Sequence, residues 1–374
     1  MKHDNRYIWF DLMRGLAALM VSVYHLRNAV MVEFSMIPAP TLTDKVFYFL
    51  SGLGHQAVMI FFVLSGFFVG GSVLRNQYQF SWWSYLVSRL SRLWIVLIPA
   101  LLLTYLVDTY LASIYPEVLA GSFESVWHSG PIAGQYSESL LTLLGNVFFV
   151  QKVFTPVFGT NGPLWSLANE FWYYLLFPLS WQAIVGFLPA KGNASRVLAI
   201  GLMALILFYM PMDMRYGLLI WLFGVGVYWA LAKDFVMRQL GLLLSAALFV
   251  AALVHGKLHG GQLSDLLVGI SFSAVCIGVA KLSPPQYFHG AIVKLARGLS
   301  EFSYSLYLSH FPIVMLIGVC CYGRNRITPS FGGYFQLGVW FLLLVGIGAM
   351  FWWLFEKRTN IVRKALLRLF KIDS

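Results

Sequence analysis

Two residues in the first apolar stretch are placed so that they could do chemistry together. Arg14 and His25 lie within residues 8–31, a stretch long and apolar enough to cross a bilayer. Eleven residues of α-helix make about three turns and rise ~16 Å, so both side chains share one helix face. An ionisable group at membrane depth costs at least ~2.5 kcal/mol, which makes it a functional candidate. Either residue alone could be structural, but the pair, with Asp11 three residues before Arg14, favours a site.

A carboxylate lies inside a later apolar stretch. Glu170 follows the run Asn161–Gly162–Pro163–Leu164–Trp165 and lies about two turns into residues 164–186. A lone carboxylate there needs a partner. It could pair structurally with an arginine, or it could orient the imidazole of His25 and stabilise its charged form.

Three further motifs carry polar groups or glycines into apolar surroundings. Ser65 and Gly66 end the run from Phe61, where small residues let a ligand or another helix approach. Arg89 and Arg92, three residues apart and with Arg75 nearby, offer planar forks suited to phosphate oxygens, although the orientation rule for membrane proteins would also explain them. The run from Ser303 to Pro312 forms a polar stripe that contains Tyr304 and His310; it could line a cavity or join helices.

Composition places these residues in a membrane protein. Of 374 residues, 59% are hydrophobic and only 11% are charged, against about 25% charged in soluble domains. The net charge of +11 does not indicate nucleic-acid binding, because the positive residues cluster at span ends. No cleavable signal peptide and no metal-ligand cluster are expected, and the three cysteines suggest packing rather than a disulfide framework.

Hydropathy predicts an all-α, polytopic membrane protein with about ten transmembrane helices. With the N-terminus inside, eighteen Lys and Arg residues fall on inner segments and seven on outer ones, so both termini are predicted to be cytoplasmic. Residues 140–150 are too short to span and predict a re-entrant or interfacial segment. The predicted spans are 8–31, 46–74, 93–111, 164–186, 196–211, 215–231, 239–255, 264–281, 299–321 and 333–355.

Two segments lie outside this bundle. The longest outer segment, about 112–163, contains aromatic and acidic residues that could contact a carbohydrate or form an ordinary interfacial loop: Glu117, Phe123, Glu124, Trp127, His128 and Glu138. The C-terminal residues predict a basic amphipathic helix on an anionic inner leaflet. The predicted domains are therefore a membrane domain, 1–356, and a basic cytoplasmic tail, 357–374.

The motifs together resemble the membrane acyltransferase 3 family. Arg14 to Leu19 followed by Tyr24–His25 is similar to that family's motif of arginine, ten residues and histidine. The run from Phe61 to Gly66, the arginine pair, Trp165 to Glu170 and Tyr304 to His310 follow in the family's order. The resemblance implies acyl transfer, most often of acetyl from acetyl-CoA, to extracytoplasmic glycans and other acceptors. The carboxylate motif, Ala168–Asn169–Glu170, has fewer acidic residues than many relatives, so only Glu170 is carried over.

We therefore expect a bacterial inner-membrane O-acyltransferase. Cytoplasmic acyl-CoA would bind through Arg89, Arg92, Arg14 and the Ser65–Gly66 motif. His25 would act as general base or accept the acyl group, Glu170 would orient it, and Asp11, Trp165, Tyr304 and His310 are further candidates. The expected acceptor is a hydroxyl of a lipid-linked or exported glycan; no metal or nucleic acid is expected. Two alternatives remain open: a small cytoplasmic acceptor such as a macrolide or amino sugar, and a proton-coupled transporter.

Overall fold

The computed structural model describes residues 7–119, 134–184 and 192–369, together with Gly121, Trp127, Gly130 and Ile132. Several residues of the sequence predictions lie outside these ranges: Lys2, Arg6, Phe123, Glu124, His128, Lys191 and Lys371. The chain divides into two compact units. Unit 1 comprises Met1–Arg14, Val58–Tyr85 and Ser166–Leu299, and unit 2 comprises Gly15–Ala57, Leu86–Trp165 and Ser300–Ser374. Long helices such as α1, Ile8–Val30, pass from one unit into the other.

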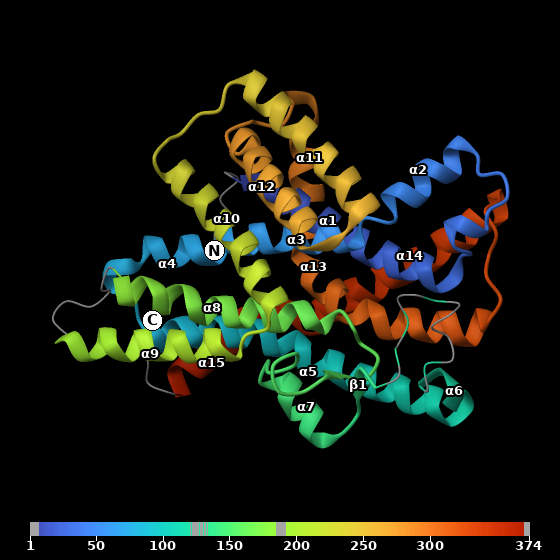
Figure 1. Ribbon diagram of the computed structural model, residues 1–374, viewed down its shortest axis with the longest axis horizontal. Coiled ribbons are helices and arrows are strands. Elements are labelled where there is room, and N and C mark those ends of the chain that lie inside the picture. Colours follow the sequence, from blue (N-terminus) through green and yellow to red (C-terminus); the bar gives the residue numbers. More distant parts are fainter. Residues whose placement is uncertain are drawn as a thin grey trace. The chain divides into compact units, whose positions relative to one another are not determined.

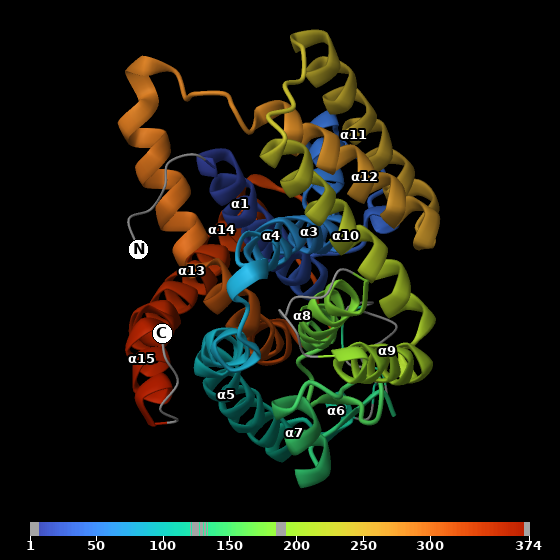
Figure 2. The same cartoon turned by 90° about the vertical axis from the view of Figure 1, so that its left-hand side faces the viewer.

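Unit 1 contains the helices of the middle of the chain. Most of α3, Gly54–Ser65, continues through a π-helix, Gly66–Gly70, into α4, Gly71–Arg75. The unit also holds most of α8, Leu164–Ile184, and all of α9, Gly192–Tyr209. The last three helices, α10, Met212–Ala232, α11, Gln239–His259, and α12, Gly261–Val279, pack together, with α11 and α12 side by side (Figure 2).

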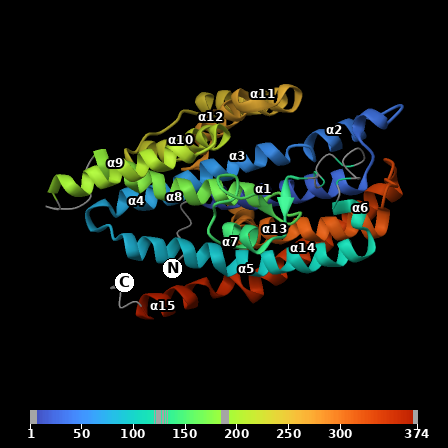
Figure 3. The ribbon, with the colours of Figure 1, turned by 60° about the horizontal axis from the view of Figure 1, so that its bottom comes forward.

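Unit 2 is built on the two longest C-terminal helices and on α5. Most of α5, Trp82–Ile114, most of α13, His289–Ile317, and α14, Phe331–Leu354, contribute to one hydrophobic core (Figure 3). α2, Leu42–Leu50, and the C-terminal part of α1 complete that core. Trp127 of the long loop is 1% exposed and stacks on Phe311 with ring centroids 6.2 Å apart, so it packs in the core.

Small elements complete unit 2 (Figure 1). They include α6, Pro116–Leu119, and α7, Leu140–Val147, which falls on the predicted non-spanning segment; its eight residues span ~12 Å, too short to cross a bilayer. Two short strands, β1, Tyr136–Ser137, and β2, Val157–Phe158, pair in parallel. The C-terminal tail forms α15, Thr359–Leu369, a helix as predicted.

Seven helical segments in the described ranges are long and apolar enough to cross a membrane. They are Leu42–Arg75, Trp82–Ile114, Met212–Ala232, Gln239–His259, Gly261–Val279, Gln286–Tyr322 and Phe331–Leu369. The other three predicted spans are also helical, as α1, α8 and α9, but α1 carries three charged residues and the apolar part of α9 is short. The structure thus confirms an all-α, polytopic membrane protein, while the number ten and the side of each terminus stay predictions.

Two predicted spans are not continuous α-helices. The span 299–321 passes from α13 into a π-helix, Gly318–Tyr322, and the span 46–74 is interrupted more than once. Residues 46–74 include α2, a turn at 51–53, α3 and the π-helix from Gly66. Gly66 and Gly224 explain part of this geometry, because the backbones cross closely there. A Cβ on Gly66 would lie 1.9 Å from the Trp221 carbonyl oxygen, and one on Gly224 would lie 1.9 Å from the Val63 carbonyl oxygen.

Two prolines inside helices expose backbone carbonyl groups that other segments satisfy. Proline lacks the N–H that would bond the carbonyl four residues earlier. In unit 1, Pro178 of α8 deprives the Tyr174 carbonyl of its helical N–H donor, and the Tyr85 hydroxyl donates to this carbonyl instead, at 2.9 Å. In unit 2, Pro312 of α13 likewise removes the helical donor to the Leu308 carbonyl, and Asn161 Nδ2 donates to that carbonyl at 3.1 Å. Side chains thus restore the bonds that the prolines remove.

Candidate active site

Two histidines meet in unit 2. Nδ1 of His25, on α1, lies 3.0 Å from Nε2 of His310, on α13. The two rings stack at an interplanar angle of 28°. His310 is 1% exposed, whereas His25 is partly exposed. His25 is therefore the more exposed residue of the pair.

The hydrogen bonds of His310 select a tautomer for both rings. His310 Nδ1 lies 2.8 Å from the Tyr307 carbonyl oxygen and 3.1 Å from that of Leu306. Carbonyl oxygens only accept, so Nδ1 carries the proton and Nε2 of the neutral ring accepts. His25 Nδ1 must then donate to His310 Nε2. The lone pair of His25 is consequently on Nε2, where a general base or a nucleophile needs it.

The segment of α13 around His310 is fixed on both sides. The Tyr307 hydroxyl donates to the Pro163 carbonyl at 3.2 Å, and Asn161 holds the Leu308 carbonyl. Asn161 Nδ2 also donates to Thr104 Oγ1 at 3.2 Å. Because Asn161 is fully buried, these bonds are shielded from water and hold the loop before α8 rigidly against α13.

A buried carboxylate supports that loop. Asp108 of α5 is 0% exposed and accepts from the backbone N–H and the hydroxyl of Thr160, each at 2.7 Å. Gly159, at φ +56°, lets the backbone approach, since a Cβ there would lie 2.3 Å from Asp108 Oδ2. Tyr136 of β1 is close enough to be affected by the Asp108 charge. Burial and this charge raise the pKa of Tyr136 to about 12, and its phenol therefore stays protonated. Asp108 therefore positions the residues that hold α13.

Unit 1 holds Arg14, one of the three arginines of the predicted site. Arg14 and Asp11 form an ion pair with 3.2 Å between Nη2 and Oδ1, as their spacing predicts. The Arg14 guanidinium also lies 5.5 Å from the ring centroid of Phe68, next to the π-helix. About a fifth of each charged side chain remains exposed, so the pair is not sealed inside the protein.

A chain of hydrogen bonds in unit 1 ends on Glu170. Trp221 Nε1 donates to Ser65 Oγ at 3.1 Å, and the Tyr174 hydroxyl donates to Glu170 Oε2 at 3.2 Å. The hydroxyls of Ser65 and Tyr174 are 3.2 Å apart, and because the Tyr174 proton goes to Glu170, Ser65 is the donor. Ser65 thus acts on the Glu170 carboxylate through Tyr174, and Gly66 permits the close helix contact described above.

Comparisons with known proteins identify the family of the chain. A family profile described as "Acyltransferase domain" matches residues 7–358. The chain belongs to the acyltransferase 3 family. It is 26% identical to the acyltransferase MdmB of Streptomyces mycarofaciens over 316 residues, 76% of this chain and 75% of that protein. It is 23% identical to the O-acetyl transferase of Shigella phage Sf6 over 327 residues, 82% of this chain and 85% of that protein. No solved structure matches it.

Several residues predicted for this acyltransferase have clear structural contacts. Tyr304 donates to the Leu93 carbonyl at 3.0 Å and so joins α13 to α5. Trp165 lies under Lys152, whose Nζ is 5.0 Å from the ring centroid, and next to the His55 ring. Arg89 and Arg92 lie three residues apart on α5 in unit 2.

The predicted couple between His25 and Glu170 is not seen within either unit, because Glu170 belongs to unit 1 and His25 to unit 2. The observed partner of His25 is His310, which the sequence suggested only as a further candidate. The role of Glu170 in orienting His25 stays a prediction.

Sequence reasoning missed several buried charged residues of the acyltransferase, among them Asp108 and Arg27. Asp108 lies inside the predicted span 93–111, so the argument that singled out Arg14 and His25 would also have found it. Arg27 lies near the end of the predicted span 8–31, where a long side chain is expected to reach water or lipid headgroups. Its side chain is 7% exposed, and its guanidinium lies 4.9 Å from the Tyr48 ring centroid. The hydropathy of the first span does not predict that α2 covers the Arg27 guanidinium.

Proposed function

We propose that the protein transfers an acyl group, most simply acetyl, from acyl-CoA to a hydroxyl group of an extracytoplasmic or lipid-linked glycan. The observation that carries this proposal is the His25–His310 pair, in which His25 Nε2 holds the free lone pair. The family and the phage O-acetyl transferase among the relatives support transfer to oxygen. The assignment of a glycan as acceptor and of CoA as donor rests on the motif resemblance.

His25 acts on the acceptor in one of two ways. As a base, Nε2 takes the acceptor proton while the hydroxyl oxygen attacks the thioester carbonyl; the carbon–sulfur bond then breaks, and the proton passes to the CoA thiolate. As a nucleophile, Nε2 first accepts the acyl group and the thiolate leaves; in a second step the acceptor oxygen takes the acyl group from Nε2, and the acceptor proton passes to the CoA thiolate. In both cases His310 holds Nδ1 and keeps the reacting nitrogen fixed.

The cations of the protein bind and orient the donor. Arg89 and Arg92 engage phosphate oxygens on the predicted cytoplasmic side, because guanidinium forks match them. Arg14, held by Asp11, contacts the donor within the membrane region. Glu170 is the carboxylate that we propose to orient His25; its Oε2 accepts from the Tyr174 hydroxyl at 3.2 Å.

Removing the His25 imidazole tests the proposal. We expect His25→Ala to lower acyl transfer by roughly 10²–10⁴-fold, the usual contribution of a general base, while the protein still inserts and folds. The measurement is acetyl-CoA consumption and acceptor acetylation by purified protein in lipid. His259→Ala, at the exposed end of α11, is the matched control. Near-normal transfer by stably folded His25→Ala would disprove the central role of His25.

A further inference from the structure

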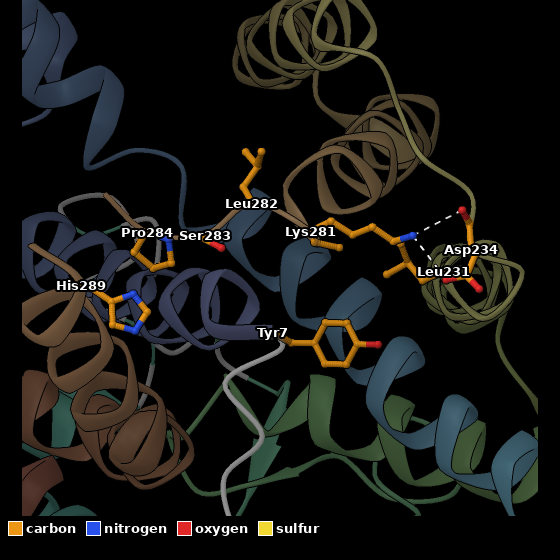
Figure 4. Close-up of a pocket in the computed structure, with 9 residues that line it drawn as sticks. Tyr7, Leu231, Asp234, Lys281, Leu282, Ser283, Pro284 and His289 are labelled. Carbon is orange, nitrogen blue, oxygen red and sulfur yellow. Dashed lines mark hydrogen bonds and ion pairs between the residues drawn. The ribbon is translucent and has the colours of Figure 1, made fainter. Parts of the chain in front are cut away.

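A cavity in unit 1 contains polar groups that the proposed reaction does not use. Its volume is about 580 Å³, within the range of small-molecule sites. Figure 4 shows the Tyr7 ring between the Lys281–Asp234 pair on one side and His289 on the other. The lining residues are Tyr7, Leu231, Asp234, Ala280, Lys281, Leu282, Ser283, Pro284 and His289.

The carboxylate of this cavity is held in a conformation that few residues adopt. Asp234 follows α10 with φ +56°. Its N–H donates to the Leu231 carbonyl, and the Phe235 N–H donates to that of Ala230, the two bonds of a Schellman helix end. Glycine is the usual residue there, and Asp is one of the few others that tolerate this conformation. The helix end thus holds a carboxylate at the open rim of the cavity, where the Asp234 side chain is 95% exposed and lies 3.4 Å from Lys281 Nζ.

The other polar groups come from the loop after α12 and from the start of α13. Lys281, Ser283 and His289 supply an ammonium, a hydroxyl and an imidazole. Trp9 Nε1 donates to the Leu282 carbonyl at 2.8 Å, which fastens this loop to the first turn of α1. His289 is the first residue of α13, and its own N–H donates to the Gln286 carbonyl of the preceding 3-10 turn, so the imidazole is the group that it offers to the cavity.

The aromatic and apolar lining distinguishes the cavity from a plain phosphate site. Tyr7 is half-buried, stacks on Phe10 at 5.4 Å and meets the edge of Phe67 at 4.9 Å, so its ring is held in place. Leu231 and Pro284 add apolar surface. Cations bind phosphate, a carboxylate accepts from hydroxyl or amino groups, and an aromatic ring contacts a base. One ligand that presents all three features is a phosphorylated nucleoside.

We propose that this cavity binds the phosphorylated adenosine end of the acyl-CoA donor, an assignment that rests on the proposed function. Lys281 and His289 contact phosphate, Asp234 accepts from a ribose hydroxyl or the adenine amino group, and Tyr7 contacts the base. Lys233 and Arg238, which lie on either side of Asp234 in the sequence, add positive charge that attracts a polyanion. The cavity lies entirely within unit 1 and is independent of Arg89 and Arg92.

The test uses the full-length protein in nanodiscs and three probes: CoA, adenosine 3′,5′-bisphosphate and pantetheine. Calorimetry should show that the bisphosphate binds and competes with CoA, whereas pantetheine alone does not compete. Lys281→Gln and His289→Gln should each weaken CoA and bisphosphate binding roughly tenfold, the loss of a charge-assisted contact. Lys294→Gln, an exposed lysine of α13 outside the cavity, should leave both affinities unchanged.

A labelling experiment separates the nucleotide from a lipid headgroup. Phosphatidylethanolamine also carries a phosphate and an amino group. The reaction of Lys281 with an amine reagent is quantified by mass spectrometry in phosphatidylcholine nanodiscs, with added bisphosphate or with phosphatidylethanolamine. Protection by the bisphosphate supports the proposal. Protection by phosphatidylethanolamine alone would overturn it and identify a lipid site.

Failure of this proposal and failure of the proposed function give different results. If acetyl-CoA is consumed but Lys281→Gln and His289→Gln bind CoA as the wild type does, the cavity assignment is wrong and the reaction stands. If the bisphosphate protects Lys281 while acetyl-CoA is never consumed, the cavity binds nucleotide and the proposed reaction is wrong.

Discussion

His310 determines which nitrogen of His25 can react. Two backbone carbonyls fix the proton of His310 on Nδ1, and this places the proton of His25 on its own Nδ1. His310 is therefore a positioning residue: it acts on the substrate only through His25. Replacing His310, whose Nε2 is the side-chain acceptor of His25 Nδ1, therefore tests this role.

We expect His310→Ala to lower kcat at least tenfold with little change in the KM for acyl-CoA, since the Nδ1 proton of His25 loses its acceptor. His310→Gln offers a side-chain oxygen to the same proton and should recover part of the loss. A changed pH profile of kcat should accompany His310→Ala. Equal activity of the Ala and Gln variants would show that His310 only fills space.

At the residue scale, one rule about ionisable residues inside membrane spans selected several residues of the candidate site. The same rule was not applied to every predicted span, so Asp108 was missed. The rule that membrane-buried charges are functional found Arg14, His25 and Glu170, and it would have found Asp108. The His25–His310 contact was not predictable, because 285 residues separate the two histidines and only the packing of α1 against α13 brings them together. Asp11 and Arg14 pair as their spacing predicts, since one helix fixes the geometry.

At the scale of elements, Pro312 and Asn161 act as a pair. Asn161→Ala leaves the Leu308 carbonyl without its donor in a buried place and should cost about 1–3 kcal/mol of stability. Pro312→Ala restores a backbone N–H that can bond the same carbonyl. The double variant should therefore lose less stability than the two single variants suggest, which thermal unfolding in detergent can measure. Strict additivity would show that Asn161 stabilises the fold through other contacts.

The crossing of α10 with the π-helix gives a second element-scale prediction. Gly224→Ala should be strongly destabilising, because its Cβ would lie 1.9 Å from the Val63 carbonyl oxygen. Gly226→Ala, two residues later on the same helix, meets nothing within 4 Å and should be neutral or stabilising by up to ~1 kcal/mol. Their melting temperatures provide the comparison. Similar values would contradict the close crossing.

Helix positions were largely predictable and their interruptions were not. Each of the ten predicted spans contains helix, because apolar runs of this length must satisfy their backbone internally. The π-helix at Gly66 and the turn after α2 depend on backbone contacts such as that between Gly66 and Trp221, which hydropathy does not encode. The parallel pair β1–β2 escaped notice because each strand has only two residues.

For the whole molecule the question is the side from which each substrate arrives. The distribution of Lys and Arg predicts that Arg89 and Arg92 face the cytoplasm and that His25 lies toward the outer half of α1. In sealed vesicles of known orientation, acetyl-CoA on the cytoplasmic side should support acetylation of a glycan confined to the outer side. A requirement for both substrates on the cytoplasmic side would favour a small cytoplasmic acceptor. Acetyl-CoA consumption from neither side would favour transport.

The proline-freed carbonyls also bear on how the chain is made. In both cases the donor side chain precedes the carbonyl it satisfies: Tyr85 comes 89 residues before Tyr174, and Asn161 comes 147 residues before Leu308. Synthesis proceeds from the N-terminus. When the ribosome delivers α8 or α13 to the membrane, the donor for its open carbonyl has already been synthesised. Neither proline helix needs to wait in lipid for a partner still to be translated.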